Sequence, residues 1–346
     1  MNCPRLKHFA RINPDATVSR CGHMVMAPGF GSFEELESSA WSNNIQLQMD
    51  RDEWPQECRR CQTTEQLSNT SIRLDSIERD KVLKKIKKDY LIIGGVLDNV
   101  CNSACQFCSA ELSTKIGTLE SGKNYIKINN VLLFNSLPKD RIVELDINGG
   151  EPSYSKNYRQ LLENLPPNIK IVRINTNASK YLDIEQLLKN NITVIITVSF
   201  DGTKKIFEYT RWPIKWSTFN NNIKKYKQLR EQYSNFKLQF WSSISAYTVG
   251  DLDNMLEYAN SHDIPYSYGL IELPGVLHIR YKNKFTLTAV EQLKSSNSKL
   301  AKDLLKILAT KINNDDDLVR SIKKQDVLRG TDYNKVYFKD VDIQNK

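Results

Sequence analysis

The sequence predicts an α/β protein built on a partial barrel of parallel strands with helices outside. From Tyr90 onward, strand-sized apolar runs alternate with helical stretches, and this alternation favours a parallel sheet covered by helices. Six such units in about 190 residues suit an open or partial (β/α)6 barrel better than a closed barrel of eight. The expected strands are Tyr90–Leu97, Ile142–Ile147, Ile169–Asn175, Thr193–Ser199, Leu238–Ser243 and Tyr266–Ile271.

Helices are expected between most of these strands. Ile184, Leu187 and Leu188 keep the i, i+3, i+4 spacing of a helix with one buried face. The span Ser113–Pro138 gives no clear pattern, and two further helices are expected after the barrel. The expected helices are Lys156–Asn164, Ile184–Asn190, Ser217–Tyr233, Asp251–His262, Ala289–Asn313 and Leu318–Leu328.

The composition is typical of a soluble globular protein. The chain has 346 residues, of which 40% are hydrophobic and 26% charged, and this length suggests roughly two domains. No apolar stretch approaches the about 18 residues that a membrane helix needs. The opening residues MNCPRLKHFARINPD lack the apolar core of a secretory signal. We therefore expect a cytoplasmic protein with no membrane partner.

The chain is basic, with a formal net charge of +9. Much of the excess lies in Lys204–Lys237, which contains seven Lys, two Arg and two Glu and so carries a net charge of +7. A concentrated basic stretch is one sign of a nucleic-acid surface. A solvated helix face, in a chain rich in Asn, Lys and Ile, is the simpler interpretation.

Seven cysteines fall into two groups. In a cytoplasmic chain of this size, they argue for metal or redox chemistry rather than a disulfide framework. The charged segment Ser71–Asp89, with the helical run SIERDKVLKKIKKDY, separates the groups, and we place a domain boundary near residue 75–80. The early group is Cys3, Cys21, Cys58 and Cys61, and the later group is Cys101, Cys105 and Cys108.

The later group forms the motif CNSACQFC directly after the first barrel strand. Three thiolates this close can bind one face of a cubic iron–sulfur cluster and leave one iron open to a small chelating molecule. Zinc usually takes four ligands, and neither a His nor a fourth Cys stands near this loop. A chance grouping or a redox patch is the alternative.

The second strand ends in ELDINGGEP, Glu144–Pro152, about 40 residues after the cysteines. Together, the loop and this motif resemble the radical S-adenosylmethionine (radical SAM) enzymes. The resemblance implies a [4Fe–4S] cluster on the three later cysteines, with the amino and carboxylate groups of SAM on the fourth iron. It also implies SAM contacts by Phe107 near the adenine and by Gly149, Gly150 and Glu151 near the ammonium group.

Three further segments resemble the same family. RINTNAS implies that Asn177 lies near the SAM ribose, and TVSFDG implies that Ser199 reaches the ribose or the carboxylate. Asp201 would shape the turn, and Arg211, ten residues later, matches an arginine that binds the SAM carboxylate. Ordinary turn chemistry is the alternative for Asn177 and Asp201, and a surface position beside Trp212 is the alternative for Arg211.

The N-terminal segment resembles a SPASM or twitch auxiliary-cluster domain. The spacing Cys3-x12-Ala16-x4-Cys21 follows that family, with Ala16 in place of its Gly, and SFEELESSAW and WPQECRRC continue the likeness. Such domains usually follow the barrel, but one twitch-type group has the order exchanged. The resemblance implies a second [4Fe–4S] cluster on the four early cysteines. A zinc site is the alternative, as is a cluster without Cys3.

These resemblances imply three regions: an auxiliary-cluster domain at 1–75, a radical SAM partial barrel at 76–285 and a C-terminal helical extension at 286–346. The implied reaction is reductive cleavage of SAM to a 5′-deoxyadenosyl radical, which takes hydrogen from a peptide, a protein or a small molecule. A closed auxiliary cluster would relay electrons, and a flavodoxin or ferredoxin would supply them. An RNA-modifying radical SAM enzyme and a non-enzymatic cysteine-metal protein stay open.

Overall fold

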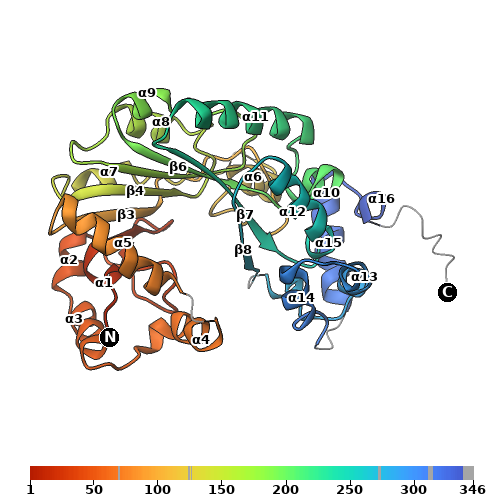
Figure 1. The fold of residues 1–346 in the computed structure, drawn as a ribbon, viewed down its shortest axis with the longest axis horizontal. Coiled ribbons are helices and arrows are strands. Elements are labelled where there is room, and N and C mark those ends of the chain that lie inside the picture. Colours follow the sequence, from red (N-terminus) through yellow and green to blue (C-terminus); the bar gives the residue numbers. More distant parts are fainter. Residues whose placement is uncertain (69–70, 124, 126, 272–273, 311–314, 338–346) are drawn as a thin grey trace. The chain divides into compact units, whose positions relative to one another are not determined.

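A computed structural model of the chain describes residues 1–337 apart from 69–70, 124, 126, 272–273 and 311–314 (Figure 1). Within these residues, one eight-stranded sheet has the strand order β2-β1-β3-β4-β5-β6-β7-β8. From β3 onward, the order in the sheet is the order in the chain. Parallel neighbours need a crossover connection, which the helices between consecutive strands provide.

Six strands lie where the sequence predicts them, which confirms the α/β class. The pairs β3–β4, β4–β5 and β7–β8 are parallel. In the described residues, β2 and β8 stand at the two ends of the strand order, as expected for an open or partial barrel. The six strands are β3 (Leu91–Val96), β4 (Ile142–Asn148), β5 (Ile171–Thr176), β6 (Thr193–Ser199), β7 (Phe236–Ile244) and β8 (Tyr266–Leu270).

Two short strands before β3 were not expected from the sequence. β1 (Phe9–Ile12) pairs parallel with β3, and β2 (Val18–Ser19) pairs antiparallel with β1. Phe9, Ala10 and Ile12 are buried. A run of four residues is too short to show the period-two pattern by which a strand is recognised, so its pairing with β3 decides its conformation.

The chain forms two compact units. The first comprises Met1–Val100, Ile126–Ile174 and Asp183–Ile195. Side-chain hydroxyls cap the N-termini of several of its helices. Ser32 accepts from the amide of Glu35, and Ser71 accepts from that of Leu74. The helices of this unit are α1 (Arg5–His8), α2 (Phe33–Ser38), α3 (Ala40–Asp50), η1 (Gln56–Cys58), α4 (Arg59–Ser68), α5 (Ile72–Ile86), α7 (Val131–Ser136), α8 (Lys156–Glu163) and α9 (Glu185–Lys189).

The second unit comprises Cys101–Tyr125, Asn175–Leu182 and Ile196–Lys346. Its core is aromatic: Phe200 lies 4.6 Å from Phe240 and 5.8 Å from Phe219, measured between ring centroids, and all three are fully buried. Its helices are α6 (Thr114–Ser121), α10 (Lys204–Thr210), α11 (Trp216–Gln232), η2 (Val249–Asp251), α12 (Leu252–Ser261), η3 (Gly275–Leu277), α13 (Lys284–Lys294), α14 (Lys299–Leu305), α15 (Asp315–Arg329) and α16 (Asn334–Tyr337).

The prediction of a single helix at Ala289–Asn313 is wrong. The chain leaves α13 after Lys294, and Ser298 begins α14 by accepting from the amide of Ala301 over 3.4 Å. Serines favour such helix starts over helix interiors, which explains the break. The last residues of that predicted helix lie outside the described residues. No helix in the described part of the chain is long and apolar enough to span a membrane.

Candidate functional site

The later cysteines lie on a loop of the second unit that is tied to the end of α10. The amide of Ala104 donates to the carbonyl of Trp212 over 2.8 Å, and that of Gln106 donates to Thr210 over 3.0 Å. On the other side, Ser113 caps α6 and donates from its hydroxyl to the carbonyl of Ser103 over 2.6 Å. Backbone hydrogen bonds on one side and the Ser113 hydroxyl on the other therefore hold the loop that carries the three cysteines.

The thiols of this loop are shielded from solvent to different degrees. Cys105 is buried, and Cys101 and Cys108 are half-buried. Burial and the neighbouring Cys105 raise the pKa of the Cys108 thiol to about 12, although Arg211 and Arg329 act in the opposite direction. A thiol must lose its proton to bind a metal, so metal binding here would release protons.

Arg211 lies between the cysteine loop and a buried acid. Its Nε donates to Asp201 Oδ2 over 2.5 Å, its Nη1 lies 3.6 Å from Cys105 Sγ, and its guanidinium lies 5.3 Å from the ring centre of Phe107. Burial opposes its charge, but Asp201 and Cys105 outweigh burial and raise the pKa of Arg211. Its side chain is only 12% exposed, so the surface interpretation does not hold.

Asp201 anchors this arginine. The carboxylate is fully buried, and burial raises its pKa although Arg211 and the amide of Ser243 stabilise the charged form. Ser243 donates its amide to Oδ1 over 2.6 Å, so one oxygen faces the backbone and the other faces Arg211. Asp201 therefore holds Arg211 toward the cysteine loop, a role beyond the turn expected from the sequence.

Asn177 is built into the same loop. Its Nδ2 donates to Ser103 Oγ over 2.7 Å and to Asn102 Oδ1 over 3.1 Å, and its Oδ1 accepts from the amide of Ser179 over 2.9 Å. The Asn177 side chain thus supports the segment between the first two cysteines of the loop. Ser199, at the end of β6, is half-buried.

In the first unit, the predicted glycine turn follows β4. Gly149 and Gly150 have φ of 76° and 60°, which favours glycine. A Cβ on Gly150 would come within 2.8 Å of the carbonyl oxygen of Val100 and 3.1 Å of that of Asp98. The amide of Glu151 donates to the same Val100 carbonyl over 2.8 Å. The turn therefore packs on the segment that leads directly into Cys101.

Two carboxylates stiffen this turn. Glu151 is buried, and its Oε1 accepts from the hydroxyl of Ser153 over 2.7 Å. Asp98 is also buried, and its Oδ2 accepts from Ser155 and from Asn157. Burial raises the pKa of Asp98 against these hydrogen bonds. Sequence reasoning missed Asp98, although its place directly after the first predicted strand resembles the other strand-end positions singled out.

The four early cysteines come together in the first unit, although up to 58 positions separate them. They line one small cavity, and Arg5, His23 and Trp54 share its wall. Cys3 precedes α1, Cys21 follows β2, Cys58 ends η1 and Cys61 lies in the first turn of α4. Short elements with buried apolar neighbours such as Leu6 and Met49 hold them there.

The environment of these thiols is apolar but rich in donors. Burial raises the pKa of Cys3 and of Cys58 to about 12 each, and the neighbouring thiols add to both shifts. Arg5 donates from Nε to Cys21 Sγ over 3.3 Å. Burial also raises the pKa of Cys61, against a hydrogen bond from the amide of Arg73. In the described residues, no group of three or more His, Cys, Asp or Glu side chains is arranged to hold a metal ion.

A residue of the C-terminal helices also reaches the cysteine loop of the second unit. Arg329, at the end of α15, donates from Nη2 to the carbonyl of Cys105 over 2.9 Å. Nothing in the sequence signals this contact, because 224 positions separate the two residues. The sequence predicted the helix but gave it no role.

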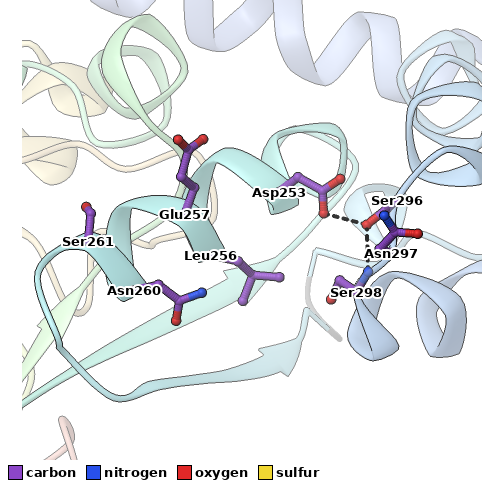
Figure 2. Close-up of a pocket in the computed structure, with 8 residues that line it drawn as sticks. All are labelled: Asp253, Leu256, Glu257, Asn260, Ser261, Ser296, Asn297 and Ser298. Atoms are coloured by element: carbon purple, nitrogen blue, oxygen red, sulfur yellow. Dashed lines mark hydrogen bonds between the residues drawn. The ribbon is translucent and has the colours of Figure 1, made fainter.

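A shallow depression lies elsewhere in the second unit, between α12 and the segment that precedes α14. Figure 2 shows its lining, with Asp253 accepting a hydrogen bond from Ser296 over 2.7 Å. It contains none of the predicted site residues. Its lining consists of Asp253, Leu256, Glu257, Asn260, Ser261, Ser296, Asn297 and Ser298.

Fold and site together define an α/β protein with two sets of gathered cysteines. No family model and no curated protein matches the chain. Among solved structures, native anSMEcpe with bound AdoMet is 16% identical, with a TM-score of 0.42, over 68% of this chain and 67% of that one. SuiB of Streptococcus suis bound to S-adenosylmethionine is 13% identical, with a TM-score of 0.38, over 89% of this chain and 70% of that one. SuiB bound to its precursor peptide SuiA is 14% identical, with a TM-score of 0.40, over 86% and 67%. All three TM-scores lie below 0.5.

Proposed function

We propose that the protein is a radical SAM enzyme that binds a [4Fe–4S] cluster through Cys101, Cys105 and Cys108. The observation that carries this proposal is the loop: three cysteines directly after β3, on a loop held by backbone hydrogen bonds to Thr210 and Trp212. The glycine turn after β4 packs on the residues that lead into this loop, and the sequence of both segments resembles that family.

The number and type of the residues present suit such a cluster. Three thiolates can bind three irons and leave the fourth for the amino and carboxylate groups of SAM. A thiolate-bound cluster is an anion, and Arg211, at 3.6 Å from Cys105 Sγ, supplies a nearby positive charge. When bound, cluster and SAM supply one-electron cleavage of SAM and hydrogen abstraction from the substrate.

The chain's own part is to bind and orient SAM. Phe107 offers an aromatic face for the adenine, and Gly149 and Gly150 let the backbone approach the ammonium group beside Glu151. Arg211 is the proposed partner of the SAM carboxylate, held in place by Asp201. Asn177 supports the cysteine loop next to the proposed ribose position, and Ser199 is proposed to contact the ribose or the carboxylate.

The early cysteines are proposed to bind a second [4Fe–4S] cluster. Four thiols lining one cavity, with N–H donors from Arg5 and Arg73 directed at sulfur, support a closed cluster. Such donors stabilise the negative charge of a thiolate-bound cluster and set its potential. With every iron bound by protein, the cluster would relay electrons and would not bind the substrate. Zinc on the same four cysteines is the competing proposal.

We propose a peptide or protein as the substrate, because the N-terminal segment resembles a SPASM or twitch domain. A flavodoxin or ferredoxin is the proposed electron donor, and the cytoplasm is the proposed location. The basic stretch is no argument for RNA. Helix α11 buries Phe219 and Tyr226 and exposes Lys224 and Lys225, as an amphipathic surface helix does without any ligand.

The proposal is tested by anaerobic reconstitution with iron and sulfide, followed by SAM and dithionite. We expect 5′-deoxyadenosine from the wild type and none from Cys105→Ala. Glu111→Ala is the matched control, because Glu111 is exposed three residues beyond Cys108 and should leave product formation unchanged. Robust formation of 5′-deoxyadenosine by Cys105→Ala would overturn the assignment.

A further inference from the structure

Arg329 is a buried arginine that belongs to no motif of the sequence. Arg329 is the last residue of α15 and is 5% exposed. Its Nη2 donates to the carbonyl of Cys105 over 2.9 Å, but Nε and Nη1 are buried and find no acceptor among the described residues. Buried polar atoms are nearly always hydrogen-bonded, so two unused donors indicate a missing acceptor at this position.

The fold holds Arg329 firmly in place. On α15, Leu318 and Ile322 join the apolar cluster of Tyr209 and Tyr247, and Phe107 of the cysteine loop packs against the same cluster. Gly330, with φ of 64°, ends the helix directly after Arg329. Helix α15 therefore packs in one apolar cluster with Phe107 of the cysteine loop and brings one cation to that loop.

Asp326 interacts electrostatically with Arg329, but no carboxylate among the described residues forms an ion pair with it. Asp326, one turn earlier on α15, accepts from the hydroxyl of Thr331 over 2.5 Å and from the amide of Tyr333 over 3.0 Å. Asp201 pairs with Arg211. Burying a cation without a partner is costly, so the balancing charge is expected from the group bound at the loop. The thiols of the loop that interact electrostatically with Arg329 are those of Cys105 and Cys108.

We propose that Arg329 is a positioning residue for the cluster on Cys101, Cys105 and Cys108, and that its open Nε–H and Nη1–H face cluster sulfur. This inference rests on the function proposed above. Because one-electron reduction adds a negative charge to the cluster, a buried guanidinium beside it stabilises the reduced state and raises the reduction potential. The C-terminal extension thereby takes part in electron acceptance.

The test is an anaerobic redox titration of the full chain, monitored by electron paramagnetic resonance. The signal that SAM perturbs identifies the cluster with an open iron. Arg329→Met removes the charge at similar volume, and Arg329→Lys keeps it. Arg320→Met is the matched control, because Arg320 lies on the same helix, 78% exposed, and pairs with Asp317. Iron content and thermal unfolding report whether each variant folds and loads.

We expect Arg329→Met to shift the midpoint potential of this cluster to more negative values, Arg329→Lys to restore most of the shift and Arg320→Met to match the wild type. An unchanged potential in Arg329→Met would overturn the proposal. So would a weaker affinity for SAM with the potential unchanged, because the missing acceptor would then be a group of SAM. If the wild type takes up no cluster at all, the proposed function fails first, and this inference fails with it.

Discussion

Arg79 on α5 donates from Nε to Glu144 Oε2 on β4 over 2.8 Å. Arg173 on β5 donates from Nε to the other oxygen, Oε1, over 2.6 Å. Glu144 is fully buried, so this one carboxylate joins two strands to the helix that follows the N-terminal cysteines. Removing the shared anion would leave both arginines without their hydrogen-bonded carboxylate, with only Asp146 as an acidic neighbour, and breaking a buried ion pair costs about 3–5 kcal/mol.

We therefore expect Glu144→Gln to lower the free energy of unfolding by about 3–5 kcal/mol, measured by chemical denaturation. Lys81→Met is the control. Lys81 lies on the same helix and pairs with Glu78, but both side chains are largely exposed, so its loss should change stability by less than about 1 kcal/mol. Equal effects of the two substitutions would show that the buried carboxylate does not join these elements.

The two cysteine sets should bind metal independently. The wild type is expected to hold about eight iron atoms as two [4Fe–4S] clusters, and joint replacement of Cys101, Cys105 and Cys108 by Ala should leave about four. The measurement is iron, sulfide and zinc per chain after anaerobic reconstitution. Zinc without iron in the triple variant would show that the N-terminal cavity is a zinc site.

The glycine turn should depend on its close approach to Val100. In Gly150→Ala, the added Cβ would lie 2.8 Å from a backbone carbonyl oxygen that must keep its bond to the amide of Glu151. We expect a loss of stability above the about 1–2 kcal/mol that a left-handed alanine costs, together with weaker binding of SAM.

Gly122→Ala separates crowding from backbone strain. Gly122 has φ of 66°, close to that of Gly150, but nothing lies within 4 Å of its added Cβ. It should therefore show only the cost of backbone strain and bind SAM as the wild type does. If both variants lose the same stability and neither loses SAM binding, the close approach at Gly150 has no role in the site.

The six strands of the barrel could be predicted because most are apolar runs or alternate buried and exposed residues, as β7 does, between polar turns. β1 could not, because four residues show no period and its pairing with β3 is a long-range contact. Arg329 escaped prediction for a similar reason: a lone arginine in a polar helix looks exposed until the fold buries it beside Cys105. The short motifs could be recognised in the sequence because their chemistry depends on a few neighbouring residues.

The early cysteines show both sides of this limit. Their resemblance to a SPASM or twitch domain predicted one shared site, and all four line one cavity. Which of them bind metal is not decided by spacing, because the position of Cys3 depends on packing. Its side chain is buried among Leu6, Ile45 and Met49, and its carbonyl accepts from the amide of Leu6 at the start of α1.

The role of Cys3 gives the sharpest prediction on the N-terminal cavity. Because its thiol is buried and interacts with those of Cys21 and Cys61, we expect it to be the fourth ligand of a closed cluster. Cys3→Ala should then change the auxiliary-cluster signal in the electron paramagnetic resonance spectrum and impair product formation. Cleavage of SAM should continue, since its cluster has separate ligands. Met24→Leu is the control: Met24 lines the same cavity and the swap conserves volume, so the signal should be unchanged. An unchanged signal in Cys3→Ala as well, with all of its iron retained, would contradict the closed cluster and with it the proposed electron relay.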